Sequence, residues 1–160
     1  IFIDSGTKIG KLVKIASMFR MSHVAIYVGN GLVFDIDFNQ RSRFRKIEEL
    51  KVREYEIKRH RDIDNFMFPP LKDLQRMTKR KYDYTGAIKS VLKKYGITFK
   101  WKDNPHRYWC SELARDYYEL VGKPLINSTD YPSIEDLYNS KKLETIIATH
   151  ESKVTLRSVV

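Results

Sequence analysis

The chain has 160 residues and a mass of 19.0 kDa, the size of one ordinary domain. Hydrophobic residues make up 42% of it, which is enough to build a core and argues against a disordered chain. The 30 Lys and Arg residues outnumber the 20 Asp and Glu residues, so the formal net charge is +10. Such a charge attracts nucleic acid, acidic lipid headgroups or anionic cell-wall polymers, and it equally suits a domain that only needs to stay soluble.

Cysteine content and hydropathy limit the compartment in which the protein works. A single cysteine excludes an internal disulfide framework, and no stretch reaches the roughly 18 to 20 apolar residues of a membrane span. The first residues lack the basic leader and long apolar run of a signal peptide, which favours the cytoplasm. Because "IFID" at residues 1–4 already has the pattern of a strand, we expect natural residues before Ile1 and a single domain over 1–160.

The apolar pattern predicts a mixed α+β domain without repeats or linkers. After the first strand, residues 9–19 have apolar side chains at helical spacing, and residues 23–38 form two β-rich runs around Asn30-Gly31, a strong hairpin signal. The densely charged residues 39–45 predict a loop. The remaining elements are expected in this order: a short segment at 46–50, a strand at 52–58, a helix opened by the prolines at 69–70, a helix over 85–95, a loop over 100–109, a helix over 110–121, and a short helix followed by a strand over 132–148.

Cys110 in "HRYWCSEL" (residues 106–113) has two interpretations. A lone cysteine is most often a small buried apolar residue. Its position supports a second role, because a helix that begins at Cys110 or Ser111 places the sulfur beside unpaired backbone N–H groups and the positive end of the helix dipole. Those groups stabilise a thiolate and can bind an oxyanion during acyl transfer.

A thiol hydrolase also needs a base, usually a histidine held by a third polar group. His60 lies in a charged run and His150 in the C-terminal tail, so we expect both side chains to be solvated. His106 precedes Cys110 by four residues but lies on a loop. His23 begins the apolar run "HVAIYVG", where a sheet would fix it; the alternative is a strand-edge histidine with one structural hydrogen bond.

Asp35 and Asp37 are the candidates for the third group. They share one face of the strand that follows the hairpin, next to the strand with His23. A carboxylate there would bind one ring nitrogen and fix the tautomer that faces the sulfur. The alternative is a pair of solvated carboxylates on an outward face, and spacing alone does not choose between the two aspartates.

Four segments together resemble a known family: "SHVAIYVGNGLVFDI" (22–36), "KYDYTGAI" (81–88), "YWCSELARDYYELVGKPL" (108–125) and "YPSIEDLYNSKKLETI" (131–146). They are similar to the NlpC-like thiol hydrolases, in the circularly permuted branch of the papain fold. The nearest group is the YiiX/YaeF-like amidases, and lecithin–retinol acyltransferase is a more distant relative. The resemblance covers about residues 1–147 and is poorest in the charged middle. His23 precedes Cys110 by 87 residues (110 − 23), which is the order of the permuted branch.

The resemblance implies an antiparallel sheet packed against helices, with the nucleophile at a helix N-terminus. It implies that Cys110 is the nucleophile and His23 the base. It puts Asp35 where the family commonly has a glutamate, with Asp37 as a fallback, and the shorter side chain implies a longer hydrogen bond or closer strands. Tyr82 matches a tyrosine often found near the oxyanion, although it would equally serve as a core aromatic. No metal or organic cofactor is implied.

The resulting hypothesis is a cysteine hydrolase that cleaves an amide through a thioester intermediate. The resemblance leaves three substrate classes open, namely cell-wall peptides, proteins or isopeptides, and lipids in acyl hydrolysis or transfer. A lipid substrate predicts an apolar groove leading to Cys110, whereas a peptide predicts a more polar cleft. The alternative is a catalytically silent module that binds nucleic acid or membrane through "RSRFRK" (41–46) and "KRHRD" (58–62), although no nucleic-acid motif accompanies them.

Overall fold

The computed structural model of the chain describes residues 1–63, 67–97, 104, 106–127 and 131–149. Short strands and helices alternate along these residues. The largest sheet is antiparallel, and its strands follow the spatial order β2-β1-β6-β9. The bounds of these strands are β1 (Phe2–Asp4), β2 (His23–Val24), β6 (Glu54–His60) and β9 (Leu143–Thr149). A second antiparallel sheet, of order β3-β4-β5, contains β3 (Ile26–Gly29), β4 (Leu32–Asp35) and β5 (Arg43–Lys46).

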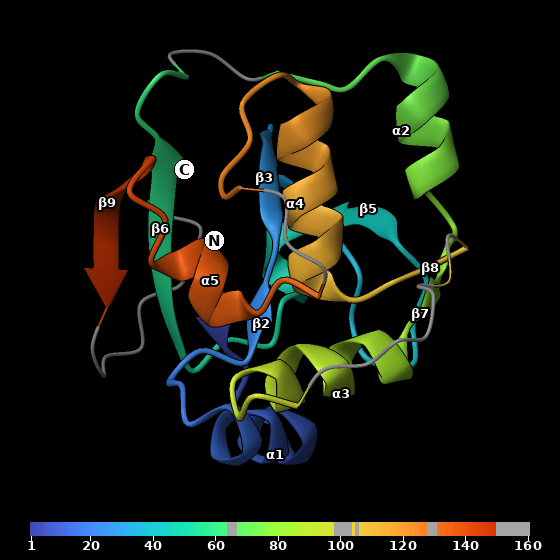
Figure 1. Ribbon diagram of the computed structural model, residues 1–160. Coiled ribbons are helices and arrows are strands. Elements are labelled where there is room, and N and C mark those ends of the chain that lie inside the picture. Colours follow the sequence, from blue (N-terminus) through green and yellow to red (C-terminus); the bar gives the residue numbers. More distant parts are fainter. Residues whose placement is uncertain (64–66, 98–103, 105, 128–130, 150–160) are drawn as a thin grey trace.

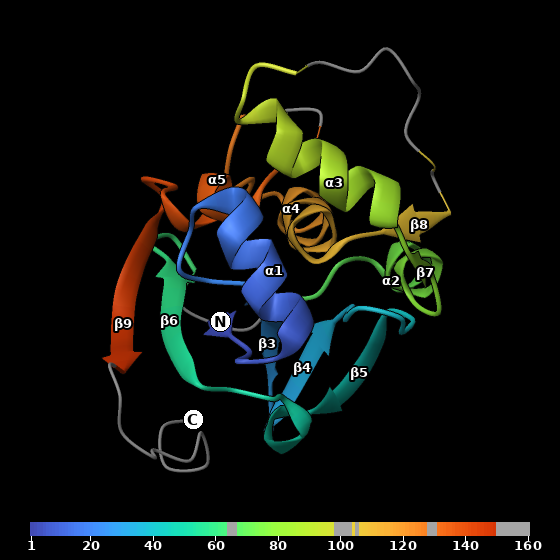
Figure 2. The same cartoon turned by 90° about the horizontal axis from the view of Figure 1, so that it is seen from below.

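The helices pack around and between these sheets (Figure 1). Their bounds are α1 (Lys8–Ser17), α2 (Leu71–Met77), α3 (Tyr84–Lys93), α4 (Cys110–Leu120) and α5 (Ile134–Tyr138), with a 3-10 turn at Ile47–Glu49. In Figure 1, α4 stands at the centre, with β6 and β9 on one side of it and α2 on the other. Figures 1 and 2 both show α1 beside α3 at one end of the molecule. The predicted α+β class is therefore confirmed.

A pair of two-residue strands brings the beginning of α3 to the beginning of α4. β7 (Lys81–Tyr82) pairs in parallel with β8 (Arg107–Tyr108), and the Asp83 N–H donates to the Tyr108 carbonyl at 2.8 Å. The Asp83 carboxylate also caps α3, because its Oδ1 accepts a hydrogen bond from the Gly86 N–H at 3.0 Å. The N-terminal ends of α3 and α4 therefore lie together.

The hairpin between β3 and β4 follows directly from Asn30-Gly31. Gly29 pairs with Leu32, so these two residues form the whole loop. Their φ angles are 53° and 69°, and two successive positive φ values define the type I′ turn, whose twist matches that of the flanking strands. The register shifts between Tyr27 and Gly29, so the turn and this irregularity together set the pairing of β4 and the position of Asp35 at the end of that strand.

The predicted apolar strand "HVAIYVG" is divided between the two sheets. β2 pairs with β1, whereas β3 pairs with β4, and only Ala25 lies between β2 and β3. The Ala25 N–H donates to the Ile1 carbonyl at 2.9 Å and holds the chain at the crossing. As a result, the sheet containing His23 meets the sheet containing Asp35 at this point.

The core consists of two clusters of buried side chains. The larger one contains Leu113 and Tyr117 of α4, packed with Phe34 of β4, and it includes Cys110. The smaller one lies around Val33, on the opposite face of β4. β4 is buried on both faces, and the Asp35 carboxylate at its end is buried as well.

Two strands lie where the sequence predicted loops. β5 falls within residues 39–45 and continues one residue beyond, because its charged side chains hide a regular pairing with β4. β8 falls within 100–109, of which residues 100–103 and 105 lie outside the described part of the chain. The strand predicted at 52–58 continues to His60, since β9 pairs with it that far.

We predict that Gly86→Ala destabilises the fold. A Cβ at this position would overlap the six-membered ring of Trp109, the residue before α4, and neither helix end can shift freely. The expected loss is about 1–3 kcal/mol in the free energy of unfolding, as for other overpacked sites, measured by urea denaturation. Gly31→Asn is the control, because that site is open and asparagine tolerates a positive φ, so the expected loss is below about 1 kcal/mol. Equal stability of Gly86→Ala and the parent chain would contradict the prediction.

Candidate active site

Cys110 is the first residue of α4, as the sequence predicted. The residues on either side of it are anchored to one carbonyl. Trp109 Nε1–H donates to the Pro132 oxygen at 3.0 Å, and Ser111 Oγ–H donates to the same oxygen at 2.7 Å. The backbone N–H of Leu113 donates to the Trp109 carbonyl at 3.0 Å and so begins the helical hydrogen bonding. The N–H groups that precede it surround the sulfur with partial positive charge.

His23 and Asp35 come together beside this helix end. The His23 Nε2–H donates to Asp35 Oδ2 at 2.9 Å, and both side chains are buried. β2, which holds His23, packs against α4, and the imidazole interacts with the Cys110 side chain. Because Nε2 is engaged by Asp35, Nδ1 is the nitrogen available to the thiol. The three residues predicted as nucleophile, base and orienting acid thus lie in one chain of contacts.

Arg45 completes this cluster, and the sequence did not point to it. Its guanidinium holds Asp35 with two nitrogens, Nε to Oδ1 at 3.0 Å and a second nitrogen to Oδ2, and the side chain is buried. Asp37 is 45% exposed and lies 3.5 Å from the same guanidinium. Of the two candidate aspartates, the structure therefore joins Asp35 to His23, and Asp37 is a surface partner of Arg45.

The charges of the cluster stabilise one another. Burial alone would lower the pKa of His23, but hydrogen bonding to Asp35 and to Cys110, together with the negative charge on both, raises it to about 10. Burial would likewise raise the pKa of Asp35, but the His23 ring and the Arg45 guanidinium hold it below its ordinary value. The arrangement favours a protonated His23 ring beside an ionised Asp35 carboxylate. Since the pKa of His23 is above its ordinary 6.5, its contribution to stability is complete below pH 6.5 and is lost as the pH rises toward 10.

Tyr82 lies near the sulfur and also belongs to an aromatic cluster. Burial, and then the negative charge of Cys110, raises the pKa of its phenol well above the ordinary value, so the hydroxyl stays protonated at neutral pH. Its ring centroid is 5.8 Å from that of Phe38 and 5.1 Å from that of Tyr84. Both interpretations of Tyr82 fit this position, because a packed ring can present a neutral O–H donor toward the thiol.

The other histidines lie outside the cluster. His106 is exposed, and its Nδ1 accepts a hydrogen bond from the Arg80 guanidinium at 3.1 Å. The expectation that His60 is solvated was wrong, because pairing of β6 with β9 leaves it 3% exposed, stacked on Tyr118. His150 lies outside the described residues.

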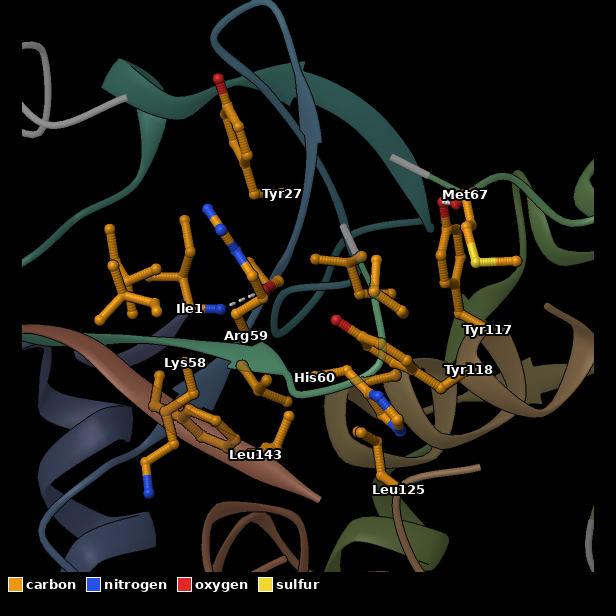
Figure 3. Close-up of a pocket in the computed structure, with 18 of the residues that line it drawn as sticks. Ile1, Tyr27, Lys58, Arg59, His60, Met67, Tyr117, Tyr118, Leu125 and Leu143 are labelled. Atoms are coloured by element: carbon orange, nitrogen blue, oxygen red, sulfur yellow. Dashed lines mark hydrogen bonds between the residues drawn. The ribbon is translucent and has the colours of Figure 1, made fainter. Parts of the chain in front are cut away.

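A cavity of about 800 Å³ lies between β3, β6 and α4 (Figure 3). His60, Tyr117, Tyr118 and Leu143 line it, and Ile1 lies at its other side. Cys110, His23 and Asp35 do not line this cavity, so it is separate from these three residues. Of the three residues, Cys110 alone lines a second space, a groove of about 390 Å³ between α1 and α3, which Tyr82 also lines.

The described residues also limit other kinds of site. Within them, no group of three or more His, Cys, Asp and Glu side chains is arranged to bind a metal ion. None of the helices described has both the length and the apolar character needed to cross a bilayer. A scan against protein-family models finds no match to the chain, and a search of curated proteins finds none either. The case for a function therefore depends on the geometry of the site.

Removing the thiol should change the titration of His23. In Cys110→Ala, one source of the elevated pKa is gone while Asp35 remains, so the pKa should fall below that of the parent chain. The measurement is an NMR titration of the imidazole signals, with His60 as internal reference because its ring is not part of the cluster. An unchanged His23 titration would show that the ring does not interact with the thiol.

Replacing Arg45 should lower the free energy of unfolding more than replacing Arg43, which lies on the same strand. Arg45→Met removes one of the two charged partners of the buried Asp35 carboxylate, the other being His23, and breaking a buried pair costs about 3–5 kcal/mol. Arg43→Met is the matched control, because that side chain is half exposed and its ion pair is surface-type, worth at most about 1 kcal/mol. Chemical denaturation of both variants measures the difference, and similar losses would show that the Arg45–Asp35 pair is not a structural constraint.

Proposed function

We propose that the chain is a cysteine hydrolase that cleaves an amide bond with Cys110, His23 and Asp35. The observation that carries the proposal is the 2.9 Å hydrogen bond between buried His23 and Asp35, beside a cysteine at the first residue of a helix. A structural cysteine needs neither a charged partner nor a helix N-terminus. A nucleophilic one needs both a base and an adjacent site for the oxyanion.

The reaction begins with the thiolate of Cys110 and the imidazolium of His23. The sulfur attacks the amide carbonyl carbon, a C–S bond forms, and the carbonyl π electrons move to the oxygen. The Cys110 N–H stabilises that oxyanion, with the Tyr82 hydroxyl as a second donor. His23 then gives its proton to the amide nitrogen, the C–N bond breaks and the amine leaves. Water, deprotonated by His23, attacks the thioester and releases the acid together with the thiolate.

Asp35 and Arg45 act through His23. The carboxylate fixes the ring with Nε2 toward itself and Nδ1 toward the sulfur, and it stabilises the imidazolium. The guanidinium keeps the carboxylate ionised and holds both of its oxygens in place. Such a supporting ion pair gives a buried catalytic group a defined orientation.

We further propose that the chain is an NlpC-like enzyme of the permuted papain-like branch, close to the YiiX/YaeF-like amidases. Support comes from the order of the elements, with the histidine strand before the cysteine helix and the acid on the strand after the hairpin. Asp35 in place of a glutamate is compatible with this proposal. The 2.9 Å distance to His23 is an ordinary hydrogen bond, so the shorter side chain is accommodated without a longer contact.

The proposal predicts that replacing Cys110, His23 or Asp35 lowers the rate of amide cleavage. Cys110→Ala and His23→Ala should each lower kcat/KM for an acyl-aminocoumarin amide by at least about 10³-fold, and Asp35→Asn by about 10² to 10⁴-fold. His106→Ala is the control, since this exposed ring faces Arg80 instead of the thiol. Release of the coumarin fluorophore measures turnover, and mass spectrometry of iodoacetamide-treated protein below pH 8.5 measures thiolate reactivity. Unchanged turnover in Cys110→Ala or His23→Ala would rule out the assignment.

A further inference from the structure

The groove that leads to Cys110 has apolar walls. It lies between α1 and α3, holds about 390 Å³, and has Cys110, Trp109 and Tyr82 at its inner end. That volume is within the range of small-ligand sites. The side chains that form its two walls are Ile9, Leu12 and Val13 of α1, and Ile88, Val91 and Leu92 of α3.

The apolar side chains of both helices are left partly uncovered. The spacing of residues 9–19 is that of an amphipathic helix, yet two side chains of this wall stay uncovered, Leu12 at 66% exposed and Ile9 at 37% exposed. Across the groove, Ile88 is 58% exposed on α3. Single exposed leucines are common on protein surfaces. Two apolar stripes that face each other across a groove containing the nucleophile instead form a surface suited to an apolar ligand.

Several of the polar side chains that line the groove are engaged within the protein, whereas Ser17 Oγ is buried there without a hydrogen-bond partner among the described residues. Ser111 Oγ donates to the Pro132 carbonyl, Ser90 Oγ donates to the Ala87 carbonyl at 2.7 Å, and Ser22 Oγ bonds to Ser5. Lys94 pairs with Glu135 at 2.6 Å at the rim. A peptide backbone in this groove would find few partners for its N–H and C=O groups, and leaving them unpaired is costly.

We propose that the groove binds the hydrocarbon chain of a long-chain N-acyl amide, with the carbonyl carbon at Cys110 Sγ. This inference rests on the proposed hydrolase function and names its substrate class. Attack by the thiolate forms the acyl thioester on Cys110, and the C–N bond breaks as His23 protonates the departing amine. Water then releases the free fatty acid, while the chain stays between α1 and α3 throughout.

The charges of the two helices fit a lipid substrate. Lys8 and Lys11 are exposed on α1 and Lys93 is exposed on α3, and neither helix contains an acidic residue, whereas Lys14 pairs with Asp4 and Lys89 is buried. Apolar stripes flanked by lysines are typical of protein surfaces that meet acidic lipid headgroups. The same positive helices would repel a cationic peptide, so the charge pattern favours an acyl chain presented with an anionic headgroup or surface.

A chain-length series tests this inference. Acetyl, hexanoyl, decanoyl and tetradecanoyl amides of aminocoumarin would be supplied below the concentrations at which they form micelles. Each methylene that enters the groove should raise kcat/KM by roughly two- to fourfold, the upper figure corresponding to complete burial. A series with no dependence on chain length, or faster cleavage of an N-acetylated peptide amide than of the decanoyl amide, would overturn the inference and leave the hydrolase proposal intact.

A matched pair of leucine variants locates the binding surface. Leu12→Gln should reduce the decanoyl-to-acetyl ratio of kcat/KM by about fivefold or more, because it puts an amide in the wall of the groove. Leu71→Gln is the control, since Leu71 is 71% exposed on α2, outside the groove, and this variant should keep the parent ratio. Equal effects of the two substitutions would place the acyl chain elsewhere.

A binding measurement separates the inference from the hydrolase proposal. Cys110→Ala should still bind an anthroyloxy-labelled stearate, followed by fluorescence, and Leu12→Gln introduced into it should weaken that binding by about fivefold or more. Binding of the probe by Cys110→Ala, together with no hydrolysis of any amide by the parent chain, would overturn the hydrolase proposal alone. Absence of binding would overturn the acyl groove.

Discussion

A buried negative charge governs the geometry of this molecule. The Asp35 carboxylate is 2% exposed, and a charge so far from water is tolerated only where partners surround it. Arg45 from β5 and His23 from β2 are those partners, so two different sheets supply them. The hairpin at Asn30-Gly31, the crossing between sheets and the pairing of β5 with β4 all serve to bring the three side chains together. The histidine is thereby oriented by groups that also hold the fold.

A separate set of contacts fixes the N-terminal end of α4, and with it the position of the Cys110 sulfur. Trp109 and Ser111 share the Pro132 carbonyl, and the ring of Trp109 lies directly against Gly86 of α3. The helix that begins at Cys110 is therefore tied to the helix that forms one wall of the groove. Proposed catalysis and proposed substrate binding depend on the same pair of helices.

Local patterns in the sequence were sufficient for the elements with strong signals of their own. The hairpin and the helices that begin near residues 9, 71, 85 and 110 could be predicted in this way, whereas the choice of His23 as the partner of Cys110 came from the family resemblance. Arg45 could not, because Arg43 and Arg45 share one face of β5, and Arg43 is directly opposite Asp35 whereas Arg45 reaches the carboxylate from its place opposite Val33. Burial of His60 depends on β9, a strand more than eighty residues away, and charged neighbours concealed it. The helical spacing of α1 was visible, but not that its apolar side would remain partly uncovered.

The single residue between β2 and β3 sets a limit on how this chain can vary. Side chains alternate between the two faces of a strand, so adding or removing one residue beside Ala25 would turn the imidazole of His23 to the opposite face. A substitution of Ala25 by another small residue would keep the direction of His23, whereas a change in length would separate it from Asp35 even if the fold survived. Chain length between the two sheets is thus as essential to the triad as the identity of its members.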